Sequence, residues 1–115
     1  MSVFTESSYG PKSARRGALV GVLGLGRSGQ SVARLLVKKG FKVLGSDSRP
    51  KAELTPLLRT LPKAAKWEWN GHSKRLLACA FVVKSPGLKP DLPIFKALAE
   101  KGIPVYSELE IALAF

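Results

Sequence analysis

A glycine-rich segment, residues 24–29 (GLGRSG), carries the clearest chemical signal in the chain. It follows an apolar run, residues 18–23, and precedes a stretch with helical periodicity, residues 30–39. A turn of this kind between a strand and a helix brings backbone N–H groups close to a phosphate, and the helix dipole adds about half a positive charge there. We therefore predict an anion-binding turn, although three glycines in six residues also occur in plain structural turns.

An acidic residue follows at the spacing that nucleotide-binding folds use. Asp47 lies 18 residues after Gly29, where a second strand-like run, residues 42–46, should end. Such folds place a carboxylate on a ribose hydroxyl roughly 20 residues beyond the glycine turn. Asp47 could instead cap the turn that follows it. We favour the binding role because the strand, the helix and the acid all occur where a ligand requires them.

Strand-like and helical patterns alternate from residue 18 onward. The predicted strands are residues 19–23, 42–46, 67–69, 80–83 and 103–106. The predicted helices are residues 30–39, 54–61, 73–78, 92–101 and a last one that starts near residue 107. Alternation with short connections favours a parallel sheet that is covered on both faces. We predict an α/β fold, a Rossmann-like doubly wound sheet of about five strands in the order 3-2-1-4-5.

Helix-end signals support these boundaries. Asp91 is the candidate N-cap of the fourth helix, with Pro93 in its first turn and Gly102 after its end. Ser107 and Glu110 have the spacing of a capping box. The last helix is still apolar at the end of the sequence, which suggests a piece of a longer protein.

The predicted strand order brings three unusual segments together. In a doubly wound sheet the ligand lies outside the carboxyl ends of the strands, where the strand order reverses. The glycine turn follows the first strand, residues 47–49 follow the second, and residues 85–87 (SPG) follow the fourth. These segments should therefore line one crevice. Residues 85–87 could also be a type II turn in which Gly87 supplies a positive φ.

Composition limits the other function classes. The chain has 115 residues and a net charge of +11, but its Lys and Arg are scattered and not interleaved with aromatic residues, which argues against specific nucleic-acid binding. No apolar run is long enough to span a bilayer, and residues 1–17 lack the apolar stretch of a signal peptide. We expect a cytoplasmic protein in which residues 1–17 form a flexible leader and residues 18–115 one domain.

The residue types of a catalytic or metal centre are scarce. Cys79 is the single cysteine and is expected to be a buried small hydrophobe. His72 is the single histidine and is expected to be a loop residue packed near Trp69, not a base or metal ligand. The sequence has no Gly-Lys-Ser/Thr loop for ATP phosphates and Mg²⁺. We predict no catalytic and no metal-binding residue.

Four segments resemble the N-terminal domain of the Mur ligases of peptidoglycan synthesis. They are residues 24–29, 45–49 (GSDSR), 83–88 (VKSPGL) and 102–110 (GIPVYSELE), and the resemblance extends over residues 18–115. The SPG and SELE segments fit the D-glutamate-adding members better than the L-alanine-adding members. The resemblance implies a domain that binds the uridine diphosphate part of UDP-N-acetylmuramoyl-L-alanine. It further implies that a central domain, against which this one packs, holds ATP and Mg²⁺ for amide-bond formation.

The resemblance also implies a role for each segment. Arg27 and Ser28 would meet the diphosphate, residues 47–49 would face the uracil and ribose, and Gly87 would let the backbone approach the phosphates. The implied UDP-binding residues are Gly26, Arg27, Ser28, Gly29, Asp47, Ser48, Arg49, Ser85, Pro86 and Gly87. We expect weak nucleotide binding at most, and no catalysis, from these residues by themselves.

Two alternatives remain open at this stage. The chain could be the corresponding domain of an L-alanine-adding Mur ligase. It could also be a redox or sensing module that binds NAD or NADP, in which case Ser48 and Arg49 would suit a 2′-phosphate.

Overall fold

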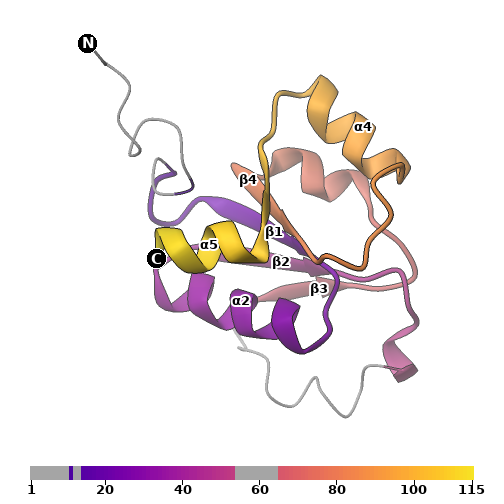
Figure 1. The fold of residues 1–115 in the computed structure, drawn as a ribbon, viewed down its shortest axis with the longest axis horizontal. Coiled ribbons are helices and arrows are strands. Elements are labelled where there is room, and N and C mark those ends of the chain that lie inside the picture. Colours follow the sequence, from indigo (N-terminus) through magenta and orange to yellow (C-terminus); the bar gives the residue numbers. More distant parts are fainter. Residues whose placement is uncertain (1–10, 12–13, 54–64) are drawn as a thin grey trace.

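The fold is a five-stranded parallel sheet with helices on both faces, as the sequence predicts (Figure 1). The computed structural model describes residues 11, 14–53 and 65–115. The strands are β1 (Leu19–Leu23), β2 (Lys42–Ser46), β3 (Lys66–Glu68), β4 (Phe81–Lys84) and β5 (Val105–Ser107). Their order is β3-β2-β1-β4-β5, and every pairing is parallel, which confirms the predicted topology.

The described helices divide between the two faces of this sheet. They are α2 (Arg27–Lys38), the 3₁₀ helix η2 (Lys74–Ala78), α4 (Pro93–Glu100) and α5 (Glu108–Ala114). Helices α2 and α5 lie side by side on one face, and η2 and α4 cover the other (Figure 1). None of the described helices is long and apolar enough to cross a membrane.

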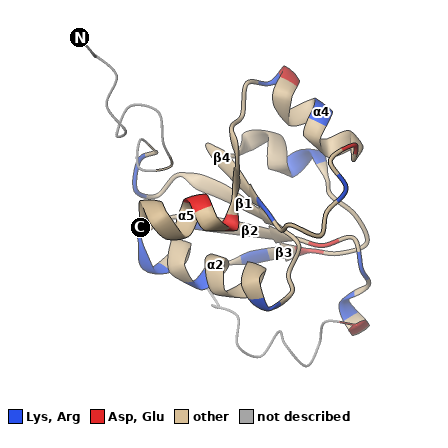
Figure 2. Cartoon of the chain, in the orientation of Figure 1, with Lys and Arg blue, Asp and Glu red and all other residues tan. Residues whose placement is uncertain are grey.

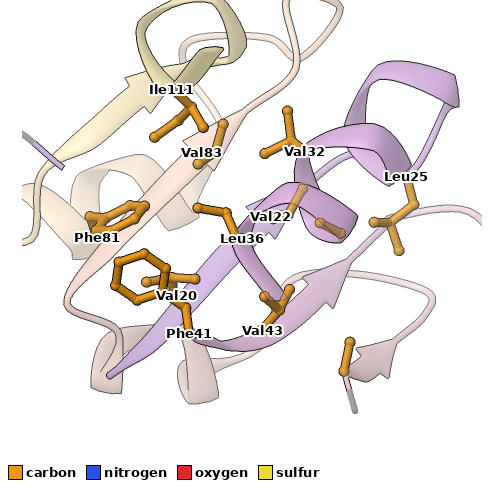
Figure 3. Packing of buried hydrophobic residues seen from close by; sticks show 12 residues of the cluster. Val20, Val22, Leu25, Val32, Leu36, Phe41, Val43, Phe81, Val83 and Ile111 are labelled. Carbon is orange, nitrogen blue, oxygen red and sulfur yellow. The ribbon is translucent and has the colours of Figure 1, made fainter. Parts of the chain in front are cut away.

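Strands β1, β2, β4 and β5 each supply both hydrophobic cores, because successive side chains point to opposite faces. In β4, Phe81 and Val83 enter the core under α2 and α5, whereas Val82 enters the core under η2 and α4. Figure 3 shows the first core, in which Phe81 also packs edge-to-face on Phe41, with ring centroids 5.6 Å apart. The apolar run at 81–83 therefore belongs to a strand that is buried on both sides, whereas Ala80, predicted as part of it, is exposed and precedes β4.

The element ends differ from the predictions by a few residues. Helix α2 begins at Arg27, not at residue 30, because Gly26 already takes the extended N-cap conformation. The N-cap of α4 is Leu92, so the prediction of Asp91 is wrong; Pro93, with its preset φ, is the first helical residue. The predicted capping box at the start of α5 is confirmed, with both hydrogen bonds present.

Part of the predicted organisation falls outside the described residues. The helix predicted at 54–61 lies there, as does most of the predicted leader, residues 1–17. Of the described part of this leader, Gly17 donates its N–H to the carbonyl of Gly40, and Ala14 packs against the first core.

Candidate functional site

A cleft of about 430 Å³ lies at the carboxyl ends of β1, β2 and β4. It is lined by Gly24, Gly26, Arg27, Ser28, Gly29, Asp47, Ser48, Arg49, Ser85, Pro86, Gly87, Leu88 and Glu108. All ten residues that the sequence predicts for a UDP site are among them. The three segments meet because parallel strands end at the same edge of the sheet. Three further residues line the cleft and are not among the predicted site residues: Gly24, Leu88 and Glu108.

Close backbone approach explains two of the glycines in the turn. Gly24 has a φ of 91°, and a Cβ there would lie 2.7 Å from the hydroxyl oxygen of Ser85. A Cβ on Gly29 would overlap the carbonyl oxygen of Gly24. By contrast, a Cβ on Gly26 would meet no atom within 4 Å. Close packing therefore requires glycine at positions 24 and 29. At position 26 a side chain would not meet the protein but would extend into open space at the cleft.

The N-terminus of α2 presents an uncompensated positive end to the cleft. Its N-cap, Gly26, supplies no side-chain hydrogen bond, and the first turn contains no acidic residue. The first N–H groups of a helix have no partner within the helix, and the macrodipole adds positive potential there. Arg27 and Ser28 are exposed and line the same part of the cleft. This arrangement suits a phosphate group.

Asp47 ties the glycine turn to the end of β2. Its Oδ2 accepts hydrogen bonds from the backbone N–H of Leu25 at 2.7 Å and from Nη2 of Arg49 at 2.9 Å. Its Oδ1 accepts from the backbone N–H of Arg49 at 2.8 Å and from Nε of Arg49 at 2.9 Å. The bond from the backbone N–H of Arg49 is the contact that the capping alternative predicts, and the bond from Leu25 is an additional, long-range contact. A contact of Asp47 with ribose stays a prediction.

The Asp47 carboxyl remains ionised although it is almost completely buried. Burial raises its pKa, but the hydrogen bonds from Arg49 and from the backbone of Leu25 outweigh burial, so the pKa lies below the ordinary 3.8. The Asp47 side chain is 3% exposed, whereas that of Arg49 is 48% exposed. Arg49 is therefore held by a two-point contact at the rim of the cleft, where a ligand can still reach its guanidinium.

The loop after β4 is a turn, but not of the type proposed as an alternative. The N–H of Leu88 donates to the carbonyl of Ser85 at 3.2 Å. A type II turn would need a positive φ at Gly87, and Gly87 is not among the glycines with that conformation. A Cβ at Gly87 would also meet no atom within 4 Å. Neither backbone conformation nor packing within the described chain requires glycine here, which leaves ligand approach as a reason.

A polar cluster around the buried side chains of Ser46 and Glu68 was missed by sequence reasoning. We call Ser46, Glu68, His72 and Ser73 the Ser46 cluster. The hydroxyl of Ser46 lies 2.6 Å from both Oε2 of Glu68 and Nδ1 of His72. Glu68 also accepts hydrogen bonds from the backbone N–H and the hydroxyl of Ser73. Glu68 is buried and ionised, because these donors hold its pKa below the ordinary 4.5 against the effect of burial.

This cluster supports the segment that carries Asp47 and Arg49. The N–H of Gly71 donates to the carbonyl of Asp47 at 3.2 Å, and that of Asn70 to the carbonyl of Arg49 at 3.1 Å. His72 follows directly and bonds to Ser46, the residue before Asp47. The expectation that His72 packs near Trp69 thus misses its main contact. A Gly-His pair two residues after a short strand was the available signal.

The protonation state of His72 follows from its neighbours. Glu68 and the carbonyl of Gly71 can only accept from Ser46, so Nδ1–H of His72 donates to Ser46 and Nε2 is unprotonated. Nε2 is buried without a hydrogen-bond partner. Burial lowers the pKa of His72 below 6.5, while the carboxylates of Glu68 and Asp47 oppose this shift in part.

We expect His72 to titrate below pH 6.5 and to carry its proton on Nδ1. NMR of its ring nitrogens measures both properties, and the assignment is unambiguous because the chain has one histidine. Since the folded pKa is lowered, stability should fall as the pH drops below the unfolded pKa of about 6.5. Urea unfolding of His72→Gln should lack this dependence between about pH 7.5 and 5.5. A His72 pKa above 6.5 would contradict the assignment.

The described residues outside the cleft show neither a concentrated basic surface nor a metal site. Figure 2 shows Lys and Arg on helices and loops of both faces of the sheet, without a single basic stripe. Among the described residues, no group of three or more His, Cys, Asp or Glu side chains is arranged to hold a metal ion. Cys79 is buried, and burial raises its pKa to about 12, so it is a poor nucleophile.

Comparison with known proteins identifies the family of this chain and several of its relatives. Residues 18–107 match the model of the family described as Mur ligase MurD-like, N-terminal domain. A UDP-N-acetylmuramoylalanine–D-glutamate ligase of Elusimicrobium minutum is 44% identical over 94 residues, which cover 82% of this chain and 20% of that protein. The chain therefore spans about a fifth of the length of this relative.

Two solved structures share the fold. A pseudomurein peptide ligase type C from Methanothermus fervidus aligns with a TM-score of 0.68 at 22% identity, over 86% of this chain and 20% of that one. UDP-N-acetylmuramate-alanine ligase MurC from Thermotoga maritima aligns with a TM-score of 0.62 at 24% identity, over 80% of this chain and 21% of that one.

Proposed function

Because the chain belongs to the MurD-like N-terminal domain family of the Mur ligases of peptidoglycan synthesis, we propose that it binds the UDP part of UDP-N-acetylmuramoyl-L-alanine. The observation that carries the proposal is the shared cleft, in which the uncapped N-terminus of α2 meets the loops after β2 and β4. The family match favours this ligand over NAD or NADP. The parent enzyme in the proposal is a cytoplasmic ligase that adds D-glutamate.

The contacts suggest an orientation for the nucleotide. The diphosphate lies over β1, against the N-terminus of α2, with Arg27 and Ser28 beside it. The uridine lies over the end of β2, where Ser48 and the guanidinium of Arg49 offer hydrogen-bond donors to the uracil carbonyls. Asp47 acts in this proposal as a positioning residue, since its two oxygens already accept four hydrogen bonds within the chain.

The chemistry of ligation belongs to the rest of the parent enzyme in this proposal. ATP with Mg²⁺ would phosphorylate the substrate carboxylate, and the amine of D-glutamate would displace that phosphate. The residues of this chain do not fit that task, because the sequence lacks a Gly-Lys-Ser/Thr loop and the described residues contain no metal-ligand cluster. We assign binding and orientation of the nucleotide to this chain, and no catalytic residue.

Helix α5 offers a surface for the proposed central domain. Leu109 and Leu113 lie one turn apart on α5 and are 68% and 79% exposed. Large apolar side chains at this spacing form a stripe that another element can cover. We propose that the central domain of the parent ligase packs here.

Calorimetric titration of the chain tests the ligand. We expect UDP to bind, and NAD⁺, NADP⁺ and duplex DNA to give no heat of specific binding at physiological salt. Gly87→Ala should weaken UDP binding by about tenfold, or about 1.4 kcal/mol, because a methyl group would enter the cleft. The unfolding midpoint should stay unchanged, since this methyl group meets no atom of the chain within 4 Å. Binding of NAD⁺ without UDP would refute the proposal.

A further inference from the structure

One carboxylate faces the cleft without a role in the proposed contacts. Glu108 is the first residue of α5 and is half-buried at the wall of the cleft. Its Oε2 accepts a hydrogen bond from the hydroxyl of Ser85 at 3.1 Å. The same hydroxyl lies 3.3 Å from the carbonyl oxygen of Gly24. Glu108 is thus held against the loop after β4 and beside the glycine turn.

A carboxylate is a poor neighbour for a diphosphate but a good partner for a hydroxyl or amide N–H. Each ionised carboxylate has about four acceptor positions. Ser85 takes one of those on Glu108. Capacity therefore remains for a donor from a bound molecule.

The order of the strands indicates which part of the ligand this donor belongs to. Along the carboxyl edge of the sheet the strands follow as β2, β1, β4 and β5. Neighbouring strands are roughly 4.8 Å apart. With uridine over β2 and the diphosphate over β1 and the loop after β4, the next group of the ligand extends past β4 toward β5. Glu108 follows β5 directly and lies at that end of the cleft.

We infer that Glu108 is a specificity-determining residue that accepts a hydrogen bond from the sugar attached to the diphosphate, through a sugar hydroxyl or an acetamido N–H. The inference rests on the proposed function and extends it from the nucleotide to the sugar. UDP without a sugar does not reach Glu108, so the carboxylate makes the cleft discriminate between UDP and UDP-sugars.

Calorimetry with two probes, UDP and UDP-N-acetylglucosamine, tests this inference. Glu108→Gln keeps the size of the side chain and removes its charge. It should weaken binding of UDP-N-acetylglucosamine by about three- to tenfold, because charge-assisted hydrogen bonds are roughly twice as strong as neutral ones. Binding of UDP should change by less than about twofold. Glu108→Ala should enlarge the loss for the sugar nucleotide.

A matched control lies on the same helix. Glu110→Gln removes the same charge from an exposed position and keeps the capping box, in which glutamine serves as well as glutamate. It should change neither affinity. Thermal unfolding of each variant shows whether the helix is intact.

The outcomes separate the two proposals. If Glu108→Gln changes both affinities equally, or strengthens UDP binding, the carboxylate faces the diphosphate; the inference is then overturned while UDP binding stands. If the unsubstituted chain binds neither probe, the proposed function fails and the inference fails with it.

Discussion

Replacing Gly29 by alanine is expected to destabilise the chain by about 3 kcal/mol or more and to abolish UDP binding. The added Cβ would overlap the carbonyl oxygen of Gly24, which is backbone and cannot rotate away as a side chain can. Either α2 or the glycine turn must move. Both carry the anion-binding face of the cleft, so stability and affinity should fall together.

Gly26→Ala is the matched control for this substitution. Gly26 has a φ of −71°, which alanine adopts without strain, and its Cβ would meet no atom within 4 Å. Its free energy of unfolding should stay within about 1 kcal/mol of the original value. Urea unfolding followed by circular dichroism measures both variants. Equal stability of the Gly29 and Gly26 variants would show that the turn does not have the close approach described here.

Replacing Asp47 by alanine should give the second large effect. The backbone N–H of Leu25 would lose its partner, and Arg49 would lose the carboxylate that holds it. An unsatisfied buried donor costs roughly 1–3 kcal/mol, so we expect a loss of stability of about 2–3 kcal/mol. UDP affinity should fall by about tenfold or more, since the segment that faces uridine in the proposed orientation is released from the glycine turn.

The pH dependence of stability shows whether the ionised form of Asp47, and not only its polarity, stabilises the fold. Its folded pKa lies below 3.8, so its ionised form adds stability that is complete above the unfolded pKa. That contribution is lost as the pH falls through the lower folded pKa. Asp47→Asn should therefore flatten the decline of stability below about pH 4. Glu68 contributes in the same range, so adding Glu68→Gln to Asp47→Asn should flatten the decline further.

Arg49→Lys tests the geometry of the contact with Asp47. Lysine keeps the charge but cannot form the two-point contact that Nε and Nη2 of Arg49 make. We expect the UDP affinity of Arg49→Lys to lie between the affinity of the unsubstituted chain and that of Asp47→Ala. An affinity equal to that of the unsubstituted chain would show that charge is sufficient at this position.

The fold class, the strand order and the meeting of the three loops could all be predicted from the amino-acid sequence. Continuous apolar runs such as residues 81–83 identify strands that are buried on both faces, and the glycine turn identifies the first crossover. Once the sheet is parallel and doubly wound, the carboxyl ends of its central strands must lie together. The shared cleft of Arg27, Asp47 and Gly87 could therefore be predicted before any coordinate was known.

The hydrogen-bond partners of the buried polar groups could not be predicted in this way, because they depend on how distant elements pack. Asp47 accepts from Leu25, Ser46 joins Glu68 and His72, and Ser85 joins Glu108, each across more than twenty residues of sequence. Local spacing predicts helices, turns and caps because their hydrogen bonds span two to four residues. It carries no information on which distant donor faces a buried carboxylate, because that depends on the register and packing of whole elements. For the same reason the three loops of the cleft could be predicted from the sequence, and only the packing of α5 against β4 brought Glu108 to its wall.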